Sequence, residues 1–300
     1  MTLPTGVLPV LQMPYFDDES IDFEALEREC DMVLEQGADG VCFALASELL
    51  RLDTGEREAV VERIGARVAG RAAFVAGIGA ESTAVARRHA LHAAGSGATA
   101  LMATPPLCTR AIPREIERYY DTLADSVDLP LIVQDASAYV GAPIDLDIQI
   151  RLARRHGTDR IAFKPEADPV GPVIRVLRDA LGSECAIYEG AGGAQLAEHF
   201  ATGLAGTIPG SEMVPAIVAL WRALQDGDTS KVRRLDALVG RIQGVAQGLD
   251  GYLALEKHRM VKTGMLPSPR VRGPVGFQWD PETRAAVDAW FDELDREVAA

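Results

Sequence analysis

Eight short apolar runs alternate with segments of helical spacing along the first two thirds of the chain, and this alternation limits the folds open to it. The runs begin at residues 6, 39, 72, 98, 129, 160, 185 and 204. Between them lie segments such as 23–37, whose apolar side chains fall on one helical face before Gly37. Parallel strands need crossover helices, and strands covered on both faces are continuously apolar. The sequence therefore predicts a (β/α)8 TIM barrel, with an open doubly wound sheet as the alternative architecture.

The last third of the chain is helical in pattern and lacks further apolar runs of strand length. A length of 300 residues suits one barrel domain with an addition. No polar, low-complexity linker separates the two parts. We therefore predict a barrel over residues 1–210 and a C-terminal helical extension over 211–300, packed on the barrel or on a neighbouring subunit as one structural unit.

Charge and cysteine usage restrict the partners and the compartment. The formal net charge of −14 repels nucleic acid and anionic lipid, and no run of about eighteen apolar residues is present to span a bilayer. The four cysteines lie far apart without a CxxC pair, and the five histidines are not clustered at metal-ligand spacing. We expect a cytoplasmic protein without nucleic-acid or membrane partners and without a bound metal.

One lysine stands among the residues that end the predicted strands. Barrel enzymes assemble their sites at these carboxyl ends, and Lys164 in "RIAFKPE" is the one lysine or arginine found there. An ammonium at the mouth of an apolar barrel is partly desolvated, which lowers its pKa and frees it to attack a ketone. This predicts a Schiff base with a 2-keto acid and no separate cofactor, whereas the alternative is a solvated lysine that closes a strand.

Glu166 follows Lys164 by two residues, so both side chains face the same way if the chain stays extended through Pro165. A carboxylate held there can move the proton at C3 of the substrate or protonate a leaving hydroxyl. The alternative is a loop glutamate paired with a surface arginine. We predict Lys164 and Glu166 as the catalytic residues.

Five stretches follow one another in order along essentially the whole chain: "GVLPVLQMPYFDDESIDFEAL", "ALASELLRLDTGERE", "ATPP", "LPLIVQD" and "RIAFKPE". Together they resemble those of the dihydrodipicolinate synthase and N-acetylneuraminate lyase family of Schiff-base barrels. The second resembles the family's "GTTGE" segment, the third its "TPYY", and the last its strand with the Schiff-base lysine. The resemblance implies a barrel lyase that acts on a small 2-keto acid and assembles as a homotetramer.

The departures from the family pattern concern its proton relay. Gln134 stands where the family usually has a catalytic tyrosine, and Leu45 and Ala46 replace its two threonines. Pro106 and Leu107 replace the paired aromatics of "TPYY". A glutamine amide is neither an acid nor a base, which argues against the biosynthetic synthase reaction.

One branch of the family, the 2-keto-3-deoxy-L-arabonate dehydratases, also lacks that tyrosine. It is similar to this chain in a "QDA" segment, matched at residues 134–136, and in a glutamate two residues after the lysine. It also has "SE" before an apolar stretch, matched by Ser47 and Glu48. The resemblance implies that Glu166 takes over proton transfer.

Further residues at strand ends are predicted to bind substrate. Backbone N–H groups around Ala46 and Ser47, with the Ser47 hydroxyl, would bind the substrate carboxylate, unless Ser47 caps the turn. Gln134 and Asp135 would bind substrate hydroxyls, unless Asp135 is a structural turn residue. Gly190 permits close approach of the backbone to a ligand, and Ile208 lies at the end of the eighth run.

The leading hypothesis is a Schiff-base lyase that dehydrates a 2-keto-3-deoxy sugar acid. The alternative within enzymes is an aldolase or a synthase-like condensation that yields or uses pyruvate. A third reading, from a different class, is a catalytically impaired barrel that binds keto acids reversibly.

Overall fold

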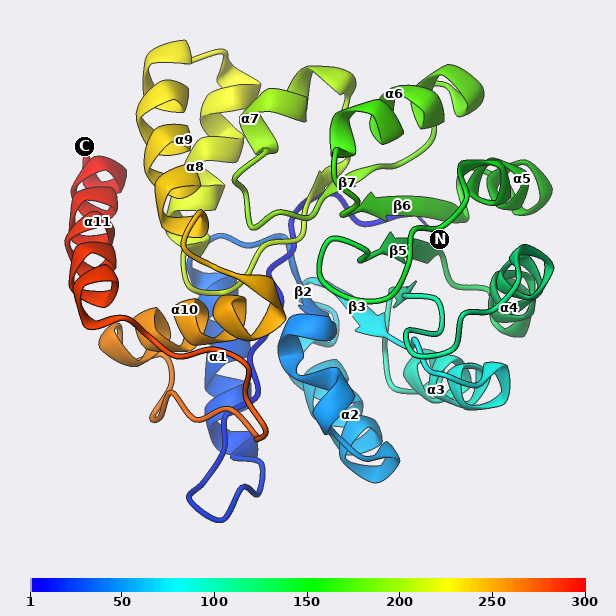
Figure 1. The fold of residues 1–300 in the computed structure, drawn as a ribbon, viewed down its shortest axis with the longest axis horizontal. Helices are drawn as coiled ribbons and strands as arrows, with labels where there is room; N and C mark the ends of the chain where they lie inside the picture. The colour runs from blue at the N-terminus through cyan, green and yellow to red at the C-terminus, as the bar shows by residue number, and fades with distance from the viewer. Residues whose placement is uncertain (1) are drawn as a thin grey trace.

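Eight short parallel strands are arranged in a ring with helices outside it, as the computed structural model of residues 2–300 shows (Figure 1). Each strand overlaps one of the apolar runs of the sequence, although the seventh begins only at the end of its run. The strands are β1 (Gly6–Val7), β2 (Gly40–Phe43), β3 (Ala73–Gly77), β4 (Ala100–Ala103), β5 (Leu131–Asp135), β6 (Ile161–Pro165), β7 (Tyr188–Glu189) and β8 (Gly206–Thr207).

The ring is closed by single bridges between two groups of strands. Strands β2 to β6 pair in sequence order, and β8 pairs with both β1 and β7. Parallel bridges between Val10 and Cys42 and between Phe163 and Ile187 join the two groups. The predicted (β/α)8 barrel is therefore confirmed, and the open sheet is excluded.

Helices connect the strands along the outside of the ring. They are α1 (Phe23–Glu35), α2 (Thr54–Val68), α3 (Thr83–Gly95), α4 (Pro113–Ser126), α5 (Leu146–His156), α6 (Val170–Leu181) and α7 (Leu196–His199). Two short 3-10 turns, η1 (Leu45–Ser47) and η2 (Leu49–Arg51), follow β2, and η3 (Phe200–Thr202) follows α7. Acidic residues begin several helices: Asp22 accepts the Ala25 N–H, and Asp53 and Glu56 accept each other's backbone N–H.

Four helices follow β8 and cover one side of the barrel. They are α8 (Val214–Asp226), α9 (Thr229–Gln243), α10 (Gly248–Lys262) and α11 (Pro281–Ala299). Helix α9 packs against both α8 and α11, whereas α10 lies against η1 at the end of β2 (Figure 1). Helix α10 therefore reaches the end of the barrel where the strands finish.

Buried apolar side chains form two layers. An inner cluster fills the barrel with alternate residues of the strands, including Val75, Met102, Ile132 and Ala162. A larger cluster fills the space between the strands and the surrounding helices. Within residues 2–300, no helix combines the length and the apolar character required to cross a bilayer.

Candidate active site

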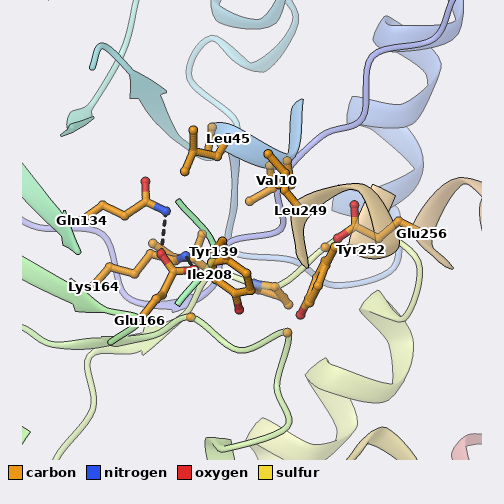
Figure 2. Close-up of a pocket in the computed structure, with 16 residues that line it drawn as sticks. Val10, Leu45, Gln134, Tyr139, Lys164, Glu166, Ile208, Leu249, Tyr252 and Glu256 are labelled. Atoms are coloured by element: carbon orange, nitrogen blue, oxygen red, sulfur yellow. Dashed lines mark hydrogen bonds and ion pairs between the residues drawn. The ribbon is translucent and has the colours of Figure 1, made fainter. Parts of the chain in front are cut away.

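Lys164 and Glu166 lie together at the carboxyl end of β6. Strand β6 remains extended through Pro165, and the Lys164 Nζ is 2.6 Å from the Glu166 Oε1. The β5–β6 register places Gln134 directly beside Lys164, and the Gln134 Nε2 donates a 2.6 Å hydrogen bond to the Glu166 Oε2. Glu166 therefore uses one oxygen for the lysine and the other for the amide (Figure 2).

The Glu166 carboxyl is buried, which makes it a weaker acid than an exposed glutamate. The side chains of Lys164 and Glu166 are only 5% and 6% exposed. Burial raises the pKa of Glu166, while the nearby Lys164 and the Gln134 donor act in the opposite direction. A carboxyl with a raised pKa at the end of a barrel strand is suited to accept and to return a proton.

The pair opens onto a pocket with about 460 Å³ of empty volume, part of it continuous with solvent. Strand ends supply one wall, and α10 supplies the wall opposite Lys164 (Figure 2). The lining residues are Val10, Ala44, Leu45, Ala46, Gln134, Tyr139, Lys164, Glu166, Gly190, Gly192, Ile208, Pro209, Gly210, Leu249, Tyr252 and Glu256.

Gly190 is required by the close packing around Lys164. A Cβ on Gly190 would stand 2.6 Å from the Glu166 Cγ and 3.0 Å from the Lys164 Nζ. The loop after Gly190 is held by Glu189, whose carboxylate accepts the N–H groups of Ala191 and Gly193. A larger residue at position 190 would push apart the two groups that the predicted chemistry needs.

The predicted substrate-binding residues divide into two sets. Ala46, Gln134, Gly190 and Ile208 line the pocket together with Lys164 and Glu166. Ser47 and Asp135 do not belong to that lining.

The side chains of Ser47 and Asp135 are engaged with the backbone instead. The Ser47 hydroxyl donates to the Leu11 carbonyl at 2.5 Å and accepts the Ala44 N–H. The Asp135 carboxylate accepts the N–H groups of Ser137 and Ile144, which shapes the loop after β5. These contacts agree with the turn-forming role that the sequence left open as the alternative for each side chain.

Three polar lining residues were missed by the sequence reasoning: Tyr139, Tyr252 and Glu256. Tyr139 comes from the loop that Asp135 shapes, and Tyr252 and Glu256 come from α10. Leu249, Tyr252 and Glu256 follow one another at intervals of three and four residues, which places them on one face of the helix. The signal available in the sequence was a tyrosine and a glutamate at the three- and four-residue intervals that place side chains on one face of a helix.

A closed (β/α)8 barrel with a buried lysine–glutamate pair at the end of its sixth strand has the architecture of a barrel enzyme. The model of the "Dihydrodipicolinate synthetase family" matches residues 3–289. The chain therefore belongs to this family, and it is a lyase.

Individual relatives are distant. The chain is 27% identical to the L-2-keto-3-deoxyarabonate dehydratase of Azospirillum brasilense, over 97% of this chain and 94% of that protein. It is 24% identical to a probable 2-dehydro-3-deoxy-D-pentonate aldolase of Escherichia coli, over 87% and 88% of the two chains. Among solved structures, it is similar to a dihydrodipicolinic acid synthase family protein of Escherichia coli in complex with pyruvate. That match has a TM-score of 0.88 and 21% identity, and covers 97% of this chain and 98% of the other.

Proposed function

We propose that this lyase dehydrates a 2-keto-3-deoxy sugar acid through a Schiff base on Lys164, with Glu166 as the acid and base. The observation that carries the proposal is the contact of Glu166 with both Lys164 and Gln134 at the end of an apolar pocket. The similarity to the L-2-keto-3-deoxyarabonate dehydratase of Azospirillum brasilense supports the substrate class.

The first step forms the covalent bond. The Lys164 ammonium has to lose a proton before its nitrogen attacks, and Glu166 at 2.6 Å is the acceptor in place. Attack on the C2 carbonyl gives a carbinolamine. Glu166 then returns the proton to the carbinolamine hydroxyl, which leaves as water, so that an iminium ion and the Glu166 carboxylate remain. The iminium withdraws electrons from C3 and so makes its protons more acidic.

Glu166 then completes the dehydration. As a carboxylate it removes a proton from C3, which gives an enamine. As a carboxylic acid it gives the proton to the C4 hydroxyl. The C4–O bond then breaks, water leaves with the electrons of that bond, and the enamine electrons form a double bond between C3 and C4. Hydrolysis of the unsaturated iminium restores Lys164, so the net change is the loss of one water.

Gln134 favours this reaction over aldol cleavage. Cleavage between C3 and C4 begins with removal of the proton on the C4 hydroxyl, and the Gln134 amide beside Lys164 is no base. The amide instead orients the Glu166 carboxylate through their 2.6 Å hydrogen bond. One carboxylate acting in turn as base and acid is sufficient for dehydration.

An aldolase that releases pyruvate is the second candidate, and Tyr139 is the observation that favours it. Tyr139 lines the same pocket as Lys164 and brings a hydroxyl to it, although burial raises the pKa of the phenol and so opposes its ionisation. A phenol there offers an alternative proton carrier for the C4 hydroxyl. One relative is named as an aldolase of a related keto acid, which agrees with this candidate.

Product analysis separates the two reactions. The purified protein is incubated with five- and six-carbon 2-keto-3-deoxy sugar acids, and the products are followed by mass spectrometry and by a pyruvate assay. We expect a keto acid lighter by one water and no pyruvate. Stoichiometric pyruvate from the wild-type protein would overturn the assignment in favour of the aldolase.

Two variants assign the proton transfers. Glu166→Gln keeps the size of the side chain but removes the acid, so dehydration should fall by about 10²–10⁴-fold while covalent trapping of the keto acid persists. Tyr139→Phe is the matched variant in the same pocket and should leave dehydration within about threefold of wild type. A large loss in Tyr139→Phe with little change in Glu166→Gln would reverse the two roles.

A further inference from the structure

The wall of the pocket opposite Lys164 carries polar groups that the proposed dehydration does not use. Helix α10 directs Tyr252 and Glu256 toward the pocket, across from the lysine–glutamate pair (Figure 2). The Gln12 Nε2 donates to the Glu256 Oε2, which fixes the carboxyl group from the side of the barrel. The other oxygen, Oε1, accepts no hydrogen bond from residues 2–300.

Several buried polar atoms meet at this wall without a hydrogen bond. Among residues 2–300, neither the Glu256 Oε1 nor the Tyr252 hydroxyl has a partner, and both atoms are shielded from solvent. Glu256 is fully buried. Because buried polar groups in folded proteins are nearly always hydrogen-bonded, two free atoms beside a pocket indicate the position of a ligand group.

Glu212 adds a second carboxyl behind Glu256. The Glu212 Oε2 and the Glu256 Oε1 each lie 2.2 Å from the point where a Cβ on Gly210 would stand, so the two oxygens are close to each other. The Glu212 Oε1 accepts a 2.7 Å hydrogen bond from the Gln243 Nε2. Gly210 itself lines the pocket, and its missing side chain leaves room for the two oxygens.

The two carboxyls retain protons more readily than exposed ones. Burial raises the pKa of Glu212 to about 7, and burial together with Glu212 raises that of Glu256 well above its ordinary value. The wall therefore presents an acidic but partly protonated pair, which both accepts and donates hydrogen bonds.

A similar arrangement surrounds Gly192. A Cβ at this position would stand 1.9 Å from the Tyr252 hydroxyl and 2.6 Å from the Gln243 Nε2, and the backbone φ of +63° also favours glycine. Glycines thus bring the loop after β7 and the loop after β8 against the polar groups of α9 and α10. The far end of the pocket is bounded by donors and acceptors, whereas the middle is bounded by Leu45, Leu249 and Ile208.

We propose that the Glu256 Oε1 and the Tyr252 hydroxyl bind the hydroxyl groups at the far end of the substrate chain. The inference rests on the proposed function, since it places the keto carbon at Lys164. A hydroxyl donates to Glu256 and accepts from Tyr252, whereas a methyl leaves both atoms unpaired and a carboxylate is repelled by the negative charge that the Glu212–Glu256 pair carries when ionised. This end of the pocket selects 2-keto acids with a hydroxylated tail and disfavours those that end in a second carboxylate.

The test measures how tightly three keto acids load onto Lys164. Pyruvate has no tail, a five-carbon 2-keto-3-deoxy sugar acid has a hydroxylated tail, and 2-oxoglutarate ends in a carboxylate. The readout is the concentration that gives half-maximal covalent trapping with borohydride, measured by intact mass. Wild type should load the sugar acid at a concentration about tenfold or more below that for 2-oxoglutarate.

Substitutions at the wall should change selectivity and spare the lysine. Tyr252→Phe should raise the half-maximal concentration of the sugar acid by about tenfold. Glu256→Gln should lower the ratio of the half-maximal concentration of 2-oxoglutarate to that of the sugar acid by a similar factor. In both variants pyruvate should remain within about twofold of wild type, because it does not reach the far wall. Tyr119→Phe is the matched control, since it removes the hydroxyl of another buried tyrosine that does not line the pocket, and it should leave all three values unchanged.

The outcomes separate this inference from the proposed function. If pyruvate is trapped on Lys164 in every variant and the preference for the hydroxylated acid does not change, the far-wall assignment is wrong and the Schiff base stands. Equal weakening of pyruvate and the sugar acid would also overturn it, because general damage to the pocket would explain both. If the wild-type protein traps none of the three, the proposed function itself fails.

Discussion

Two lysines are buried beside glutamates in this molecule, and their surroundings differ. Lys164 meets Glu166 at the end of β6, while Lys257 in α10 meets Glu48, which follows η1. The side chains of Lys257 and Glu48 have no exposed surface, whereas those of Lys164 and Glu166 retain a small exposure to the pocket. The comparison separates a lysine placed for chemistry from one placed for structure.

Lys257 has its donors fully engaged. Its Nζ donates to Glu48, to the Met13 carbonyl at 2.7 Å and to the Arg270 carbonyl at 2.6 Å, and it lies 4.9 Å from the centre of the Tyr15 ring. Burial lowers the pKa of Lys257, although Glu48 opposes this change. A lysine with three acceptors and no access to a pocket is a crosslink between distant segments.

Lys164 has a single carboxylate partner and faces open volume. Glu166 contacts Lys164 through one oxygen and accepts a hydrogen bond from Gln134 through the other. The lysine can therefore release its proton to a carboxylate that Gln134 holds in position. The difference teaches that burial and a glutamate neighbour do not make a lysine reactive. What matters is a free approach for a ketone and an acceptor that takes the proton.

Replacement of Lys164 is expected to have the largest effect. In Lys164→Met, turnover should fall by roughly 10⁴-fold or more, because no other group in the pocket can form the iminium. The melting temperature should fall less than in a variant that breaks the Lys257–Glu48 pair, since the Glu166 carboxyl has a raised pKa beside the pocket and can take up a proton when the ammonium is removed. Steady-state kinetics and thermal unfolding test both statements, and substantial remaining turnover would place the nucleophile elsewhere.

Replacement of Lys257 should lower the stability of the fold and leave the reactivity of Lys164 intact. Lys257→Met leaves Glu48 buried without its ammonium partner, and loss of one member of a buried pair costs about 3 kcal/mol or more in the free energy of unfolding. The Glu48 Oε2 keeps the Arg272 N–H and has Arg51 at 3.6 Å, which places the expected cost near the lower end of the range. Urea unfolding gives the value directly.

A double variant provides the control for Lys257. Glu48→Gln combined with Lys257→Met removes both charges, so the double variant should regain about 1 kcal/mol or more over Lys257→Met alone. The folded fraction of Lys257→Met should still trap pyruvate, because Lys164 is intact. Loss of trapping in a folded Lys257 variant would contradict the division between the two lysines.

The smallest expected effect concerns Gln134. Its hydrogen bond stabilises the ionised form of Glu166, so Gln134→Leu should raise the pKa of Glu166 further. Because Glu166 must be ionised to remove the C3 proton, the acidic limb of the pH–rate profile should move to higher pH. Turnover below that limb should fall by about tenfold. An unchanged limb would mean that Glu166 does not control the acidic side of the profile.

The fold was predictable because strands buried on both faces appear in the sequence as continuous apolar runs. Their apolar runs and the helical segments between them were sufficient for the closed barrel, and the lone strand-end lysine was sufficient for the centre of the candidate site. The short extents of β7 and β8 were not predictable, since much of the ring there is joined by single bridges.

The rest of the site depends on contacts between residues that are distant in sequence. The Ser47 side chain is held away from the pocket because its hydroxyl donates to the carbonyl of Leu11, in the segment that follows β1. Tyr252 and Glu256 reach the pocket because α10 packs across η1. Local spacing shows that the two share a helix face, but it does not show which surface that face meets.

The most direct test of the account is peptide mapping after reduction of the protein with borohydride in the presence of a 2-keto acid. The account predicts one added keto acid per chain, located on Lys164 and absent from Lys257, with Lys164→Met losing the modification and Lys257→Met retaining it. No added mass would leave a barrel that binds keto acids reversibly at most, and a modification on another lysine would contradict the assignment of Lys164.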